Sequence, residues 1–216
     1  MRNLLLLSGV LAGSWICGNL RAANPEPSAE WVLISKSDDI AIYRRPRSGP
    51  GHNESKVIGA IAAPTEVVHA VIDDIEAYSQ FMPYTVECRV LKRDADSVLT
   101  YQRISAPLVS DRDYTLRVRT TVKTVEGGKS YFSRWETENA LGPAEKRGVV
   151  RVNLCEGSWL LEPVGPNSTR ATYMIYTDSG AALPDFIKNT GSQIGLRKMF
   201  VAVRKQARDP KYAVKQ

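Results

Sequence analysis

The sequence predicts an α+β fold in which a long curved antiparallel sheet wraps around one long C-terminal helix. Segments between residues 31 and 177 alternate apolar and polar residues with a period of two, as strands with one buried face do. One long segment, 184–208, closes the series with helical spacing of its apolar residues. Because a sheet with one apolar face must cover that face, we expect the C-terminal helix to lie across it.

The expected elements follow one another along the chain. Strands come first at 31–35, 40–44 and 57–61, with a tight turn joining the first two. Pro64 begins a helix, because the first helical position needs no N–H, and a second short helix ends before Pro83. Six further strands are expected, at 86–90, 98–104, 114–118, 131–135, 150–163 and 169–177.

The C-terminal helix is expected to carry two apolar stripes on different sides. At ~100° per residue, Ile187, Gly191 and Ile194 share one side, and a second stripe begins at Leu196 on nearly the opposite side. Gly191 and Gly195 lie one turn apart, although glycine in a helix interior destabilises it by ~1 kcal/mol relative to alanine. They therefore permit close approach, leave room or allow bending. A curved sheet gripping one helix leaves a natural space for an apolar ligand, unless side chains fill that space.

The N-terminus has the layout of a secretory signal peptide. Arg2 precedes an apolar run at 4–16, and residues 20–22 (LRA) form a small-residue cleavage site. The apolar run is shorter than the ~20 residues of a membrane-spanning helix, which disfavours an uncleaved anchor. We therefore expect a periplasmic or secreted protein. Its expected parts are a signal peptide at 1–22, a leader at 23–30, one folded domain at 31–208 and a tail at 209–216.

The charge of the chain is mildly basic. The formal net charge of the whole sequence is +6, and the loss of Arg2 and Arg21 with the signal peptide lowers it by two. This excess suits a transient contact with an anionic membrane surface. The sequence has no run of Lys and Arg with interleaved aromatic residues, so we expect no nucleic-acid partner.

The residues that usually carry catalysis or bind metals are few. Cys88 and Cys155 sit inside apolar strand patterns and are expected to be free and buried, although an oxidising compartment permits a disulfide. His52 lies in a loop and His69 lies off the apolar face of its helix. This set predicts no metal, no cofactor and no cysteine–histidine nucleophile. Acid–base chemistry by a cavity aspartate or tyrosine stays open.

Three motifs follow one another along the chain, at residues 109–114, 148–163 and 173–189 (VSDRDY, GVVR with GSWLLEP, and YMIYTDSGAALPDFIKN). In this order they resemble those of START domains, the lipid-transfer modules related to the steroidogenic acute regulatory protein. Residues 109–114 (VSDRDY) are similar to the V-S-x-R-D-[FY] segment of that family. Residues 148–151 (GVVR) and 157–163 (GSWLLEP) resemble the next two stretches. Residues 173–189 resemble the strand, the turn and the start of the last helix, although Phe186 replaces the usual tryptophan.

The resemblance runs over most of the chain and implies a function. It implies the helix-grip fold, with a lipid or other hydrophobic small molecule held in an internal cavity for transport or sequestration and no catalysis. Residues 78–91 also resemble the broader Bet v 1-like superfamily, which includes polyketide cyclases. A cyclase- or aromatase-like enzyme on the same fold is therefore the alternative.

Strand parity and the resemblance together indicate the ligand-binding residues. Inward-facing strand residues form either cavity wall or packed core, and Arg112 either fixes a strand end together with Asp113 or contacts a ligand head group. We expect no catalytic residue. The expected ligand-binding residues are Tyr114, Leu116, Val118, Tyr131, Trp135, Val150, Val152, Leu154, Cys88 and Arg112, and, in the C-terminal helix, Ile187, Thr190, Gly191 and Ile194.

Overall fold

The computed structural model describes residues 30–47, 53–178 and 192–213, and their main element is one sheet. Its strands pair antiparallel, except that β8 pairs parallel with β6. The strands are β1 (Val32–Ser37), β2 (Ile40–Pro46), β3 (Asn53–Ile61), β4 (Thr85–Arg93), β5 (Val98–Ile104), β6 (Arg112–Val125), β7 (Gly128–Thr137), β8 (Val150–Arg151), β9 (Cys155–Gly165) and β10 (Ser168–Thr177).

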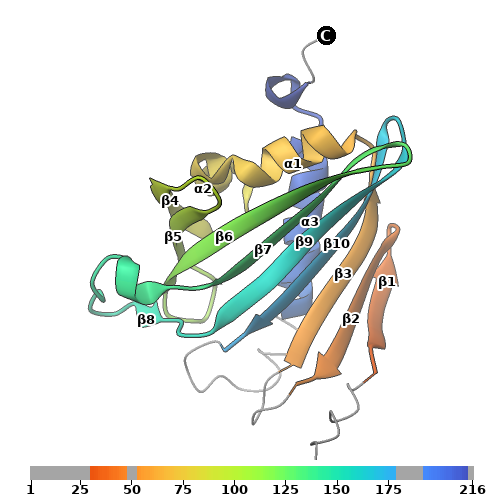
Figure 1. Ribbon diagram of the computed structural model, residues 1–216. Coiled ribbons are helices and arrows are strands. Elements are labelled where there is room, and N and C mark those ends of the chain that lie inside the picture. The colour runs from red at the N-terminus through yellow and green to blue at the C-terminus, as the bar shows by residue number, and fades with distance from the viewer. Residues whose placement is uncertain (1–29, 48–52, 179–191, 214–216) are drawn as a thin grey trace, which may run out of the picture.

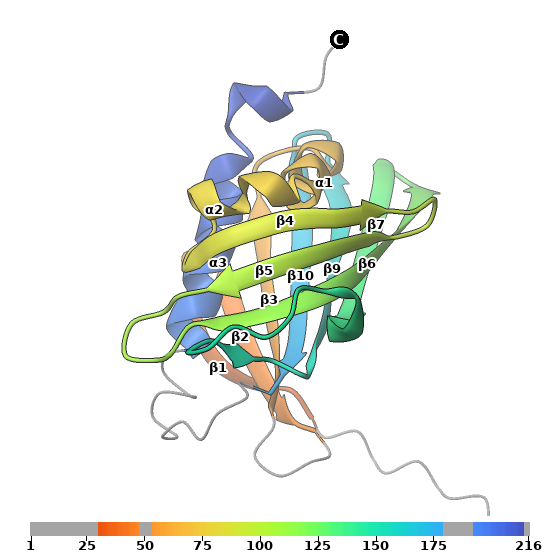
Figure 2. The ribbon, with the colours of Figure 1, turned by 90° about the vertical axis from the view of Figure 1, so that its left-hand side faces the viewer.

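The sheet joins the first strands of the chain to the last ones by direct pairing. The order is β1-β2-β3-β10-β9-β7-β6-β5-β4, so the last strand closes against the third. Figure 1 shows the strong twist of this sheet, with a helix, α3 (Ser192–Gln206), lying along its inner side. In Figure 2 the strands β4, β5 and β6 cross β3, β9 and β10 at a steep angle. The sheet therefore curls around the C-terminal helix, and the predicted fold class is confirmed.

The shorter helical segments lie across one end of the curled sheet (Figure 2). They are α1 (Thr65–Asp73), a 3-10 turn (Ile75–Ala77) and α2 (Tyr78–Phe81); two further 3-10 turns span Asn139–Leu141 and Pro210–Tyr212. A helix starts here as expected, but α1 begins at Thr65, and Pro64 is its N-cap rather than its first helical residue. The carbonyl oxygen of Pro64 accepts hydrogen bonds from the amides of Val67 and Val68. The expected second helix is split into the 3-10 turn and the short α2.

The main hydrophobic core lies where α1 and α3 meet the inner face of the sheet. Val68, Phe200 and Val203 are completely buried there together with residues of β2, β3, β9 and β10. Gly59 of β3 makes this approach possible, because a Cβ at that position would lie 2.8 Å from Cε1 of Phe200. This packing holds the second half of the C-terminal helix against the sheet.

The prediction of one continuous strand at 150–163 is wrong, because the structure has two separate strands there. The chain forms only the two-residue bridge β8 with β6 and then breaks, and β9 begins at Cys155. The amides of Val150 and Val152 donate to the carbonyl oxygens of Asp111 and Asp113, which draws this segment alongside β6. The place next to β7 is taken by β9 instead.

The C-terminal boundary also differs from the expectation. Tyr212, assigned to a tail from the sequence, is buried in the main core, and its hydroxyl donates to Oδ2 of Asp74 at 2.8 Å. The packed domain therefore extends beyond residue 208. The expected signal peptide, most of the leader and the first part of the expected C-terminal helix lie outside the described residues. Within the described ranges, no helix combines the length and the apolar content needed to cross a membrane.

Candidate functional site

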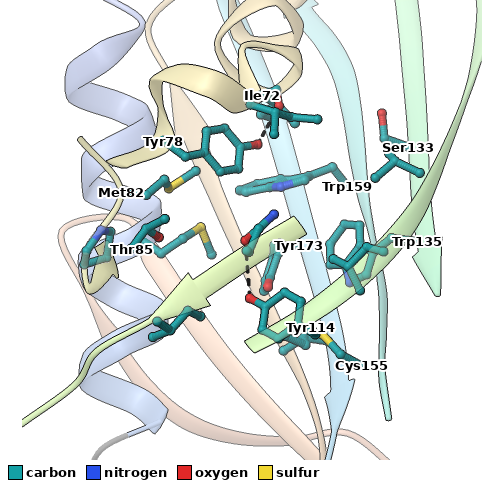
Figure 3. A pocket seen from close by; sticks show the side chains of 18 of the residues that line it. Ile72, Tyr78, Met82, Thr85, Tyr114, Ser133, Trp135, Cys155, Trp159 and Tyr173 are labelled. Carbon is teal, nitrogen blue, oxygen red and sulfur yellow. Dashed lines mark hydrogen bonds between the residues drawn. The ribbon is translucent and has the colours of Figure 1, made fainter. Parts of the chain in front are cut away.

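A cavity of about 270 Å³ lies between the concave face of the sheet, the α1–α2 segment and α3 (Figure 3). Most of its wall is apolar, contributed by Ile72, Ile75, Met82, Pro83, Ile104, Leu116, Val118, Trp135, Trp159, Ile175, Gly195, Leu196 and Met199. Polar or titratable groups also reach the wall, from His69, Asp73, Tyr78, Tyr84, Thr85, Gln102, Tyr114, Thr120, Ser133, Cys155 and Tyr173.

An aromatic cluster forms one side of the cavity wall. The ring of Tyr173 lies between two indoles, with its centroid 4.8 Å from that of Trp159 and 5.5 Å from that of Trp135. Trp159 in turn contacts Phe200, at 6.0 Å between centroids. Offset and tilted aromatic pairs of this kind are rigid as well as apolar. The cluster thus joins the cavity wall to the packed core beneath α3.

Several hydroxyl groups of the cavity already have protein partners. The Tyr78 hydroxyl donates to the carbonyl oxygen of Ile72, and the hydroxyls of Thr120 and Ser133 lie 2.8 Å apart. Burial raises the pKa of the Tyr78 phenol well above its usual value. It therefore stays protonated and uncharged at neutral pH.

A second polar pair lies on neighbouring strands. The hydroxyl of Tyr114 in β6 donates to Oε1 of Gln102 in β5, at 3.3 Å. Burial also raises the pKa of the Tyr114 and Tyr173 phenols well above the usual value for tyrosine. This part of the cavity wall, formed by Gln102, Tyr114 and Tyr173, thus offers neutral hydrogen-bonding groups in apolar surroundings.

His69 lies at the α1 side of the cavity. Its ring lies against that of Tyr131, with 4.2 Å between centroids, and its buried Nδ1 has no hydrogen-bond partner among the described residues. Burial lowers the pKa of His69, and the nearby carboxylate of Asp73 opposes this only in part. The imidazole is therefore neutral at neutral pH. The helical pattern placed His69 off the apolar face of its helix, whereas the structure places it in the cavity wall.

The two cysteines of the described chain are free and buried, as expected. Cys155 lines the cavity, whereas Cys88 lies outside the wall. Burial raises the pKa of each thiol to about 12, so neither is a thiolate at neutral pH. The described residues contain no group of three His, Cys, Asp or Glu side chains able to hold a metal. The cavity offers apolar contacts and neutral hydrogen-bonding groups, together with the imidazole of His69 and the carboxyl group of Asp73.

Four of the expected binding residues line the cavity together. Tyr114, Leu116 and Val118 project inward from β6, and Trp135 projects from β7. The residues between them face outward, as parity predicts, and Arg117 pairs there with Glu138. Strand alternation was therefore sufficient to orient β6.

Several expected residues lie elsewhere. Tyr131 shares the inward parity of Trp135 but lies in the main core beneath α1. Val152 packs against Leu116 and Cys155, and Val150 and Leu154 are outside the cavity wall. The physical reason is the short bridge β8, which removes this segment from the inner layer of the sheet.

The remaining expected residues are also separate from the cavity wall. Cys88 is buried in β4 outside the wall, and Arg112 at the start of β6 donates from Nη1 to the carbonyl oxygen of Ser110. Ile194 is 48% exposed, because α3 turns the stripe containing Leu196 toward the sheet. Ile187, Thr190 and Gly191 lie outside the described residues.

Several residues of the cavity wall were not among the expected binding residues. Gln102 is directly opposite Tyr114 in the β5–β6 ladder, and a polar residue at an inward position of an apolar strand was a usable signal. Trp159 and Tyr173 face each other across β9 and β10. Parity alone does not say that they reach the cavity, since that depends on how far the helices cover each strand.

Comparisons with known proteins agree with this architecture. The family model described as polyketide cyclase / dehydrase and lipid transport matches residues 61–200. The uncharacterized protein PA1579 of Pseudomonas aeruginosa is 26% identical over 192 residues, which cover 88% of this chain and 90% of that protein. The phosphatidylcholine transfer protein of Mus musculus is 25% identical over 170 residues, which cover 78% of this chain and 79% of that protein.

Solved structures of other proteins share the fold, and two of them illustrate it. A fragment of the STAR-related lipid transfer protein from Xanthomonas axonopodis superposes with a TM-score of 0.72 at 24% identity, covering 83% of this chain and 99% of the fragment. The Zhui aromatase/cyclase from Streptomyces sp. R1128 gives 0.53 at 13% identity, covering 72% of this chain and 93% of that one. With its matching family model and its curled sheet around a C-terminal helix, the chain belongs to the polyketide cyclase/dehydrase and lipid transport family and contains a START-like domain.

Proposed function

We propose that this protein binds a lipid or another hydrophobic small molecule in the cavity beside α3 and carries or sequesters it without altering it. The observation that supports this function is the cavity itself, with its mostly apolar wall and a volume of about 270 Å³. An apolar cavity of about 150 Å³ in another protein stays dry and binds benzene. Burial of each ligand CH₂ group contributes about 0.8 kcal/mol, so a chain or ring system binds by desolvation.

The comparisons support a lipid as the ligand class. The mouse relative is named a phosphatidylcholine transfer protein, and the Xanthomonas structure a STAR-related lipid transfer protein. Both names describe transfer rather than catalysis.

A direct test is to identify what the protein carries. Native mass spectrometry of the protein, followed by organic extraction, should reveal a hydrophobic molecule at about one per chain. Protein stripped of lipid should take up a comparable amount from vesicles. A protein that carries nothing after purification and takes up nothing from vesicles would refute the proposal.

A cyclase-like enzyme is the second candidate, and His69 is the observation that favours it. His69 and Asp73 both line the cavity, where a neutral imidazole beside a carboxyl group is suited to accept a proton. Turnover of a poly-β-ketone substrate that is lost in His69→Ala would support an enzyme. A His69→Ala variant that retains full lipid uptake, with no turnover by the wild type, supports the carrier.

We further propose that the chain is exported and contacts a membrane transiently to exchange its ligand. The three-part pattern of residues 1–22 supports export, and the basic net charge supports contact with an anionic surface. N-terminal sequencing of protein from the periplasmic or secreted fraction should begin at Ala23. Full-length protein confined to the cytoplasm would contradict this part of the proposal.

A further inference from the structure

We propose that Gln102 and Tyr114 recognise an uncharged hydroxyl or carbonyl group of the ligand, so that the ligand enters the cavity with a neutral polar group. The inference rests on the proposed function and deepens it by naming the chemistry of the ligand. It follows from the position of this pair, its remaining hydrogen-bonding capacity and the surroundings of the cavity.

The two side chains are positioned by the ladder between β5 and β6. Gln102 and Tyr114 are directly opposite each other in that ladder, and both reach the cavity wall. Their hydrogen bond runs from the Tyr114 hydroxyl to Oε1 of Gln102 at 3.3 Å, drawn as a dashed line in Figure 3. Tyr173 lies beside Tyr114 in the same view.

The pair keeps both donors and an acceptor for a ligand. With the Tyr114 hydroxyl donating to Gln102, the two amide N–H groups of Gln102 remain as donors and the phenolic oxygen remains as an acceptor. Rotating the amide by half a turn makes the phenolic O–H a donor and the amide oxygen an acceptor, so both kinds of group remain. A ligand hydroxyl satisfies both groups, and a ketone or ester carbonyl satisfies the donor.

The surroundings of the pair favour a neutral group over an ion. Ile104, Ile175 and Cys155 contribute apolar surface to the same wall. The described wall contains no lysine or arginine, so an anion held beside the pair would have no counter-charge there. An ion buried without a counter-charge is strongly unfavourable, whereas a hydrogen-bonded neutral group is tolerated.

The test compares three probes of equal length that differ in one end group. Decan-1-ol, decane and decanoate compete for the cavity against Nile red, a neutral dye, at about pH 8, where the carboxylate is ionised. Tyr114→Phe and Gln102→Met should each lower the affinity for decan-1-ol about tenfold while leaving that for decane within about twofold. Wild-type protein should bind decanoate more weakly than decan-1-ol.

The matched control removes a tyrosine hydroxyl from outside the cavity wall. Tyr43 of β2 is not part of that wall, so Tyr43→Phe should leave the ratio of decan-1-ol to decane affinity unchanged. Retained decane binding in every variant shows that the cavity is intact.

The outcomes separate this inference from the proposed function. Decan-1-ol affinity that is unchanged in both Tyr114→Phe and Gln102→Met overturns the inference, while decane binding still supports the hydrophobic cavity. Decanoate binding as tight as that of decan-1-ol also overturns it, as does loss of decane binding in both variants, since the pair then only holds the wall together. Wild-type protein that binds neither dye nor any probe refutes both.

Discussion

Asp113 and Arg151 form a two-point ion pair on the outer side of the sheet. Arg151 donates from Nε to Oδ1 of Asp113 at 2.7 Å and from Nη2 to Oδ2 at 3.2 Å. The exposed fractions of the two side chains are only 1% for Asp113 and 8% for Arg151. The Tyr101 hydroxyl also donates to Oδ2 of Asp113, at 2.9 Å. Asp113 therefore has a structural role, which is the first of the two interpretations given for the Arg112–Asp113 motif.

Breaking this pair should destabilise the fold strongly. Asp113→Ala leaves the guanidinium of Arg151 buried without its partner, so we expect the free energy of unfolding to fall by about 3–5 kcal/mol. Urea denaturation measures this change. The control is Arg119→Ala, because the exposed pair of Arg119 with Glu136 should contribute only about 0–1 kcal/mol. Equal effects of the two substitutions would contradict the structural role of Asp113.

Gly195 provides a test of the cavity that leaves the fold in place. It lies in the wall, and an added Cβ would meet no atom within 4 Å. Gly195→Phe should fill part of the 270 Å³ volume and lower the affinity for a hydrophobic dye by about tenfold or more. Gly195→Ala should preserve binding and raise the stability by about 1 kcal/mol, since alanine favours a helix more than glycine does. Dye titration and thermal unfolding measure the two effects, and undiminished binding by the Phe variant would contradict the cavity's role.

Gly59 should respond to the same substitution with the opposite sign. A methyl group at this position of β3 would lie 2.8 Å from Cε1 of Phe200, a fully buried ring of α3. Gly59→Ala must displace that ring and should lower the free energy of unfolding by about 1–3 kcal/mol. Chemical denaturation beside Gly195→Ala checks this prediction. A stabilised Gly59→Ala variant would mean that α3 does not pack on β3 as described.

The buried cysteines predict a pH dependence of both reactivity and stability. Burial raises the pKa of Cys88 and of Cys155 from 9.0 to about 12. At about pH 8 the native protein should therefore react with an aromatic disulfide reagent far more slowly than the unfolded protein, in which both thiols ionise readily. Native thiols that react as fast as those in urea would contradict their burial.

The same shifts determine how stability responds to alkali. Below pH 9.0 both states keep their thiol protons, so the thiols add no pH dependence. Between 9.0 and about 12 the unfolded chain releases protons that the folded chain retains, and stability decreases as pH rises. Urea denaturation of the wild type and of Cys155→Ala across this range isolates the contribution of Cys155, because the variant should show the smaller loss.

Much of the fold was accessible from the sequence because the relevant signals are local. The alternation of Leu116 and Val118 with Arg117 and Arg119 oriented β6, and Pro64 marked the start of α1. Each of these signals depends on the geometry of a few consecutive residues. The segment at 150–163 was misjudged because a two-residue parallel bridge depends on a distant strand and leaves no local pattern.

The sequence by itself determined which face of each regular strand turns inward, since successive side chains of an extended chain point to opposite sides. Only the tertiary structure decided which inward residues line the cavity and which fill the core. Tyr131 and Trp135 share one parity on β7, yet α1 covers the first and the cavity reaches the second. The same reasoning applies to His69 and Gln102, which meet one cavity from α1 and β5. Their shared surroundings arise from the curvature of the sheet and the positions of the helices, which are set by packing across the whole domain.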